Sequence, residues 1–148
     1  MGIMDAFRGE RIYLDTNIFI YALEAYPEYV STLTSLFAAI DEGKIKAVTS
    51  ELTLAEVLIK PMMDNNADLQ KVYKETLRSS EAFSVMPVNR QILIEAARLR
   101  AESETLRLPD AIHLATASVH HCTFFLTNDK RLGTLPDFHI VILSEPDV

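Results

Sequence analysis

The sequence is poor in cysteine, glycine and proline, and each shortage excludes a class of protein. Cys122 is the single cysteine, so the chain cannot form an internal disulfide and we expect a reducing cytoplasm. Four glycines and six prolines in 148 residues exclude a collagen-like repeat or a low-complexity linker. No apolar run approaches the roughly 20 residues that span a bilayer. The first residues also lack the basic and apolar regions of a signal peptide. We therefore expect a cytoplasmic protein without a membrane segment.

Positive charge is also in short supply. Lys and Arg total 14 against 21 Asp and Glu, which gives a formal net charge of −7 with His neutral. Such a surface repels phosphate backbones, so nucleic-acid binding would require a local patch or a bound cation. Apolar residues, by contrast, make up 49% of the chain, which suffices for the core of one domain. We expect residues 1–148 to form a single domain.

Short apolar strands alternate with helical segments along the chain. β-Branched and aromatic runs predict strands at 12–14, 46–49, 83–88, 123–127 and 139–143. Apolar residues at steps of three and four, together with capping residues, predict helices at 17–24, 27–42, 51–60, 64–79, 90–104 and 109–120. Pro61 is expected to end the helix that Ser50 caps. The alternation predicts an α/β sandwich with a short, mainly parallel sheet flanked by helices.

Four acidic residues follow or interrupt these apolar segments. Asp15 comes directly after a strand, where a helix cap is by itself the better explanation. Asp129 lies two residues after another strand, where an ordinary polar turn explains it equally well. Asp110 stands in the first turn of a helix, where the helix dipole alone favours an acid by about 0.3–1 kcal/mol. Glu56 is the most informative, because residues 54–59 are otherwise apolar and a carboxylate there is costly unless paired or metal-bound. Since functional groups of parallel sheets gather beyond the strands' carboxyl ends, the four acids together indicate one pocket.

The order of four short motifs resembles that of the PIN domain. The motifs are Leu14-Asp15-Thr16-Asn17, Thr49-Ser50 followed by Glu56, Leu108-Pro109-Asp110-Ala111, and Leu126-Thr127-Asn128-Asp129. Their spacing is most similar to that of VapC-type toxin ribonucleases, over about 11–143. The resemblance implies a three-layer sandwich with a metal site. It assigns Asp15, Glu56 and Asp110 as the acids of that site, Asp129 as the usual fourth, and Asn17 and Thr127 as supporting residues.

Clustered carboxylates explain why a metal is expected. Two carboxylates about 5 Å apart repel by roughly 3 kcal/mol at an effective dielectric of 20. Three or four together therefore need a cation, or some of them have raised pKa values. Oxygen ligands select hard ions such as Mg²⁺ or Mn²⁺, which activate water and neutralise charge on a phosphate. The resemblance then implies an endoribonuclease that leaves a 5′-phosphate and a 3′-hydroxyl. It further implies the toxin of a type II toxin–antitoxin pair, with an antitoxin partner and a homodimer.

Two other functions compete with this one. A non-catalytic interaction module on the same fold is the main alternative, and composition does not separate it from the enzyme. A phosphotransferase of the haloacid-dehalogenase type is disfavoured, because Asn17 stands where that chemistry requires a second Asp.

The remaining polar residues carry weaker signals. His113, one turn after Asp110, is expected to be a core or supporting histidine. Lys130 and Arg131 fit a phosphate-steering role and a solvated turn equally well. The basic residues Lys71, Lys74 and Arg78 share a helix face that we interpret as solvated. The neighbouring residues His120, His121 and Cys122 lack the spacing of a zinc site.

Overall fold

The computed structural model describes residues 2–145 and is built around a parallel sheet. Five strands lie in the order β3-β2-β1-β4-β5, and every pairing between neighbours is parallel. They are β1 (Arg11–Leu14), β2 (Lys46–Ser50), β3 (Phe83–Met86), β4 (Phe124–Thr127) and β5 (Ile140–Ile142). In the centre, Tyr13 of β1 lies in register with Val48 of β2 and Phe125 of β4. The predicted α/β class and parallel sheet are confirmed.

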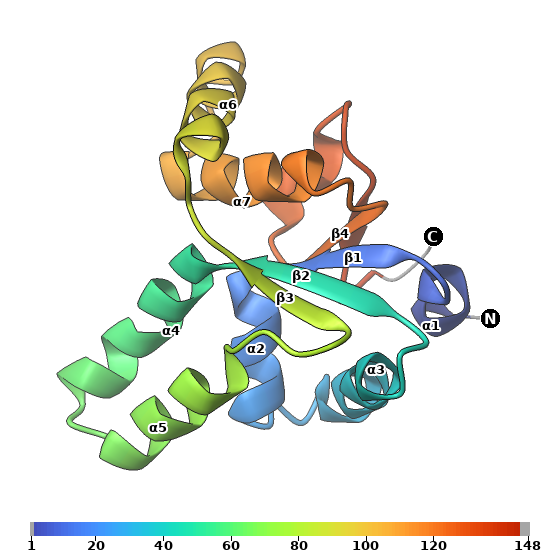
Figure 1. The fold of residues 1–148 in the computed structure, drawn as a ribbon, viewed down its shortest axis with the longest axis vertical. Helices are drawn as coiled ribbons and strands as arrows, with labels where there is room; N and C mark the ends of the chain where they lie inside the picture. Colours follow the sequence, from blue (N-terminus) through green and yellow to red (C-terminus); the bar gives the residue numbers. More distant parts are fainter. Residues whose placement is uncertain (1, 146–148) are drawn as a thin grey trace.

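Helices cover both faces of this sheet and make three layers (Figure 1). The first face packs against α1 (Ile3–Phe7), α2 (Thr16–Leu23), α3 (Val30–Asp41), α4 (Glu51–Met63) and α5 (Ala67–Thr76). The second packs against α6 (Arg90–Glu102), α7 (Leu108–Val119) and the 3₁₀-helix η1 (Lys130–Thr134). Because strand side chains alternate, Ile12 and Leu14 enter the first core whereas Tyr13 enters the second. None of the helices within residues 2–145 combines the length and apolar character needed to cross a membrane.

The helix after β2 runs further than the sequence indicates. The prediction that Pro61 ends it is wrong, because α4 continues to Met63. Proline removes one N–H from the helix, but its own carbonyl still accepts the N–H of Asn66 at 2.8 Å. Asn65, with a φ of 53°, then turns the chain. The next helix begins at Ala67 rather than at 64, because Asn66 caps it.

The N-terminal helix α1 was not predicted from the sequence. It has five residues, too few to show an apolar repeat. Its role is nevertheless clear in the structure, because Ile3 and Phe7 are buried. The ring of Phe7 lies 5.2 Å from that of Phe124 in β4, so α1 covers the amino-terminal end of the sheet.

The strand order creates a crevice at one edge of the sheet. From β1 the chain moves outward through β2 to β3, and it then returns to the other side of β1 to form β4 and β5. The direction of winding therefore reverses between β1 and β4, and the loops that leave these two strands diverge. Asp15 follows β1 and Asp129 lies two residues beyond β4. Topology alone brings these two acids to the same crevice.

Candidate active site

A pocket of about 300 Å³ opens at this crevice. Its wall includes the four acids that the sequence singles out: Asp15, Glu56, Asp110 and Asp129. They arrive from the end of β1, from α4, from the first turn of α7 and from the loop after β4. Three potential cations line the same pocket: Arg107, Arg131 and His113. Acids that are far apart in the chain thus meet at one place, surrounded by a smaller number of positive groups.

Asp15 is the most deeply buried of the four acids, with 6% of its surface exposed. Its Oδ1 accepts the backbone N–H of Thr16 at 2.8 Å, so it caps α2. Its Oδ2 accepts the hydroxyl of Thr127 at 2.7 Å. The nearest cation is His113, whose Nε2 lies 3.8 Å from Oδ1. Asp15 therefore caps α2 and also lines the pocket. Two neutral hydrogen-bond donors orient its carboxylate.

Asn17 and Thr127 join the loop after β1 to the loop after β4. The side-chain amide of Asn17 donates to the hydroxyl oxygen of Thr127 at 3.2 Å. Its carbonyl oxygen accepts the N–H of Asn128 at 3.1 Å. The same Thr127 oxygen accepts the N–H of Asp129 at 3.0 Å. These bonds hold Asp15 and Asp129 at a fixed separation, which is the contribution expected of supporting residues.

Glu56 is bound to a buried histidine. Its Oε1 accepts the hydroxyl of Thr16 at 2.7 Å and lies 2.6 Å from His113 Nε2. The other ring nitrogen, Nδ1, is 2.6 Å from the hydroxyl of the fully buried Tyr13. Because an ionised carboxylate can only accept, Nε2 carries the proton of the bond to Glu56. His113 is 2% exposed and stands behind the acids, as a core histidine in contact with them.

Pairing shifts the pKa values of these two groups in opposite directions. Burial by itself raises the pKa of Glu56, but the hydrogen bond and charge of His113 outweigh it, and the pKa is lowered. Burial likewise lowers the pKa of His113, but the bond to Glu56 and the charge of Asp15 outweigh it, and the pKa is raised. At neutral pH Glu56 is therefore an ionised group and a weak base.

Arg131 joins the two remaining acids. Its Nε donates to Oδ1 of Asp129 at 3.0 Å, and its Nη2 donates to Oδ2 of the same carboxylate. Nη2 also donates to Oδ2 of Asp110 at 3.4 Å. The neighbouring Lys130 instead pairs with Glu145 at 3.1 Å and does not line the pocket. Arg131 therefore lines the pocket and Lys130 does not, a difference that the sequence did not indicate.

The expectation that some of the clustered acids have raised pKa values is confirmed at Asp110. Burial and the charge of Asp15 raise the pKa of Asp110, although Arg131 opposes both. Burial also raises the pKa of Asp129, but the hydrogen bonds from Arg131 outweigh it, and the pKa is lowered. The pKa values of Asp129 and Glu56 are lowered instead, because each of these acids has a cationic partner. At Asp110 the contact with Arg131 relieves the repulsion only in part.

Three threonines at this edge were given no role from the sequence, although Thr16 and Thr49 stand in the quoted motifs. The hydroxyls of Thr49 and Thr53 lie 2.8 Å apart, and that of Thr49 donates to the carbonyl of Leu14 at 2.8 Å. The hydroxyl of Thr16, which binds Glu56, lies 3.4 Å from that of Thr53. The available signal was position: Thr16 follows Asp15, and Thr53 precedes Glu56 by three residues on one helix.

The arrangement gathers acids without closing them into a coordination shell. Within residues 2–145, no three His, Cys, Asp or Glu side chains are positioned to hold a metal ion together. Glu56 is turned to His113 and Asp129 to Arg131. The donors nevertheless fit a hard cation, because the acids offer oxygen alone, and because burial and the repulsion from Asp15 raise the pKa of Asp110. A divalent ion bound by Asp15 and Asp110 would remove that repulsion.

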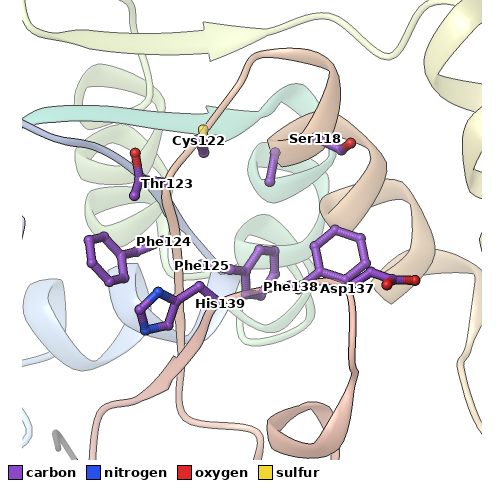
Figure 2. A pocket seen from close by; sticks show the side chains of 9 residues that line it. Ser118, Cys122, Thr123, Phe124, Phe125, Asp137, Phe138 and His139 are labelled. Atoms are coloured by element: carbon purple, nitrogen blue, oxygen red, sulfur yellow. The ribbon is translucent and has the colours of Figure 1, made fainter. Parts of the chain in front are cut away.

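A second pocket, at the amino-terminal edge of the sheet, has a different character. It measures about 330 Å³, and Figure 2 shows aromatic side chains, among them Phe125 and Phe138, around it. Burial raises the pKa of the Cys122 thiol to about 12, so this group stays protonated and is a poor nucleophile or ligand. Within the described residues its wall contains a single acid, Asp137. This pocket does not provide an alternative acidic site.

Comparison with known proteins agrees with this fold. Residues 12–137 match the PIN domain family. The fold is similar to a toxin–antitoxin complex from Klebsiella pneumoniae, with 23% identity, a TM-score of 0.66, and coverage of 89% of this chain and 97% of that chain. It is also similar to VapBC2 from Rickettsia felis, which was crystallised with a DNA fragment from its promoter. The identity is 17%, the TM-score is 0.69, and the match covers 88% of this chain and 96% of that chain. VapBC-5 from Mycobacterium tuberculosis, of the VapBC family of toxin–antitoxin systems, shows 25% identity, a TM-score of 0.56, and coverage of 90% and 97%. A search of curated protein sequences gave no significant match.

Proposed function

Because this chain belongs to the PIN domain family, we propose that it is a divalent-metal-dependent endoribonuclease, the toxin of a type II toxin–antitoxin pair. The observation that carries the proposal is the meeting of four acids on one pocket where the winding of the sheet reverses. The names of the structural neighbours, a toxin–antitoxin complex and VapBC-5, support the assignment as a toxin. The proposed nuclease domain is residues 1–148, and the proposed place of action is the cytoplasm.

Asp15 and Asp110 are the proposed holders of Mg²⁺ or Mn²⁺. Asp15 is directed by Thr16 and Thr127, and Asp110 is the acid whose pKa its neighbours raise. When bound, such an ion lowers the pKa of a coordinated water and neutralises charge on the scissile phosphate. Asp129 is the proposed fourth acid, which holds a second ion or a water at the rim of the pocket.

Glu56 has the proposed role of orienting the attacking water. Its lowered pKa keeps it ionised, so it accepts a hydrogen bond from water more readily than it removes a proton. His113 and Thr16 fix its Oε1, which leaves Oε2 for this contact. His113 acts through Glu56 and is a positioning residue.

Substrate binding has to overcome the charge of the protein. The chain carries a formal charge of −7, so attraction of a polyanion is confined to the pocket. Arg107 and Arg131 line that pocket and supply its side-chain positive charge next to the acids. Single-stranded RNA fits such a short, local contact, because its backbone can bend into a small opening.

Cleavage of single-stranded RNA by the purified protein tests the proposal. Asp15→Asn and Asp110→Asn each remove a ligand charge at nearly constant volume, and each should lower the cleavage rate at least about a hundredfold. The matched control is Asp137→Asn, an exposed acid on the wall of the other pocket, which should cleave like the wild type. Products should carry a 5′-phosphate. Cleavage that persists in EDTA, or in both pocket variants, would refute the metal mechanism.

A non-catalytic interaction module is the second candidate, and one observation favours it. Glu56 and Asp129 are already paired with His113 and Arg131, so half of the acidic set is neutralised by the protein itself. In such a module the acids would serve only to fix the positions of the loops that line the pocket. The wild type would then fail to cleave RNA and would melt at the same temperature with EDTA and with millimolar Mn²⁺.

The partners we propose are a second copy of the chain and an antitoxin. The structural similarity to a toxin–antitoxin complex supports the antitoxin. Exposed apolar side chains on α4, at Ile59, Met62 and Met63, support a protein interface. Light scattering on the purified protein tests the homodimer, and a mass equal to one chain would refute it. A small gene for a DNA-binding protein beside this gene would identify the antitoxin for co-purification.

A further inference from the structure

Arg131 binds Asp129 more completely than an exposed arginine usually binds an acid. The guanidinium meets both carboxylate oxygens in a fork, and the backbone N–H of Arg131 donates to Oδ1 at 3.1 Å. The same guanidinium reaches Asp110 across the mouth of the pocket. One side chain thereby contacts two of the four acids that line the pocket. It does so from η1, the element that directly follows Asp129.

The fork occupies the oxygens that a divalent ion would need. A carboxylate with both oxygens accepting from a guanidinium has fewer lone pairs directed into the pocket. A divalent cation and a guanidinium at the same carboxylates also repel each other. The two positive groups therefore compete for Asp110 and Asp129, and whichever is bound disfavours the other.

We propose that Arg131 is a resident counter-ion of the acidic pocket, which a divalent metal ion displaces from Asp110 and Asp129. The proposal rests on the proposed function, since it takes these two acids as part of the metal site. Arg131 then sets the concentration of metal at which the pocket fills. By competing with the ion, Arg131 raises the concentration of metal that is needed. Its positive charge also offsets the repulsion between the acids before the ion binds.

The surroundings of Arg131 allow this exchange. Its side chain is 47% exposed, so the guanidinium can swing into solvent without opening the core. Asp129 does not depend on the guanidinium for its position, because its N–H donates to Thr127 and its Oδ1 caps the N–H of Arg131. The loop after β4 thus keeps its shape when the fork is broken.

The opposite role, a clamp that prepares the acids for metal, makes a different prediction. A clamp would hold Asp110 and Asp129 at the separation that the ion requires, so its removal would weaken metal binding. A counter-ion competes with the metal, so its removal strengthens binding. The sign of the change in metal affinity separates the two.

The first experiment follows the Nε–Hε signal of Arg131 by NMR as Mg²⁺ is added. Arg131→Lys identifies the signal by its loss. The expected result is a shift of this signal towards that of a solvated arginine, saturating with the same Kd as metal binding. Arg98 is an internal control, because its Nε and Nη2 form the same fork with Glu95 on α6, at 2.8 and 2.7 Å. A signal of Arg131 that stays unchanged while the ion binds would refute displacement.

The second experiment measures the Mn²⁺ affinity of Arg131→Ala by calorimetry, which requires no substrate or turnover. The variant should bind Mn²⁺ on the order of fivefold more tightly than the wild type, about the value of an exposed ion pair. Lys130→Ala is the matched control, since its ion pair with Glu145 lies outside the pocket, and it should leave the affinity unchanged. Equal or weaker binding by Arg131→Ala would refute the counter-ion and leave the nuclease proposal standing. Absence of Mn²⁺ binding in every variant would refute both.

Discussion

Thr123, directly before β4, and Thr127, the last residue of β4, make the same kind of hydrogen bond in different surroundings. At the start, the hydroxyl of Thr123 donates to Glu10 at 2.8 Å on the exposed surface. At the end, the hydroxyl of Thr127 donates to Asp15 at 2.7 Å in a fully buried position. The first bond competes with water, whereas the second replaces water at an acid that burial would otherwise penalise. The carboxyl edge of the sheet therefore contains an organised polar network, and the amino edge does not.

The same contrast extends beyond β4. Within residues 2–145 seven polar or charged residues are buried, and six of them gather around the carboxyl ends of the strands: Asp15, Thr49, Ser50, Thr53, His113 and Thr127. The seventh, Thr116, donates to the carbonyl of Ile112 within α7. The amino edge has instead the pocket with aromatic walls of Figure 2. Burying polar groups lowers stability unless each group finds a partner. Concentration of such groups at one edge is thus a mark of function, and it yields predictions that distinguish the two edges.

The largest expected effect on stability is that of His113→Ala. The substitution leaves the buried hydroxyl of Tyr13 and the carboxylate of Glu56 without their partner and opens a cavity behind the pocket. We expect the free energy of unfolding to fall by about 3 kcal/mol, as measured by urea titration at neutral pH. His139→Ala, an exposed ring that packs on Phe124 at the amino edge, should cost under about 1 kcal/mol. If both variants lost the same free energy of unfolding, the buried polar network at the carboxyl edge would stabilise the fold no more than the exposed contacts at the amino edge.

A smaller effect, on a more specific contact, is expected when Thr127 and Thr123 are each replaced by valine. Thr127→Val keeps the shape of the side chain but removes the hydroxyl that Asp15 and Asn17 both contact. It should lower the free energy of unfolding by about 1–3 kcal/mol, because Asp15 stays buried without that donor. Thr123→Val removes an exposed bond to Glu10, and the expected change is within about 0.5 kcal/mol. If thermal or urea unfolding ranks the two variants in the reverse order, the buried network does not stabilise the fold.

Much of the fold follows from the sequence because its signals are local. The strands are apolar runs, and the caps at Ser50 and Asn89 accept the backbone bonds expected of them. Pro61 shows the limit of local rules, since a proline is tolerated inside α4. The order of the strands is set by long-range packing. It could not be read from segments of four or five residues, although it is what brings Asp15 and Asp129 together.

The acids of the candidate site were predictable one at a time, and their partners were not. Glu56 stood out because an acid in an apolar helix needs a counter-charge. That the counter-charge is His113, from a helix 57 positions further along the chain, depends on how α4 and α7 pack. The sequence could not distinguish Arg131 from Lys130, because the backbone geometry of a turn decides in which direction each side chain points. Sequence patterns therefore identified the charged residues, and the tertiary structure decided how they pair.

The smallest expected effect, and the one most specific to the acidic pocket, is the pH dependence of Asp110→Asn in EDTA. Burial and the charge of Asp15 raise the pKa of Asp110 above its ordinary 3.8, so the folded state holds this proton more tightly than the unfolded chain does. Charged Asp110 therefore destabilises the folded state above its folded pKa, and the penalty disappears as the pH falls to about 3.8. Asp110→Asn should melt at most a few degrees above the wild type at pH 7, and the gap should close on acidification.

Asp129 gives the opposite sign and serves as the control. Burial raises its pKa, but the hydrogen bonds from Arg131 lower it by more, so the pKa is lowered and the charged form stabilises the fold above the unfolded pKa. Asp129→Asn should melt below the wild type at pH 7, and this difference should vanish as the pH falls through the folded pKa. Thermal melts of the three proteins between pH 3 and pH 7 measure both gaps. If both variants melt below the wild type at pH 7, the repulsion between Asp15 and Asp110 is too weak to matter, and the pocket has no stored repulsion for a metal ion to relieve.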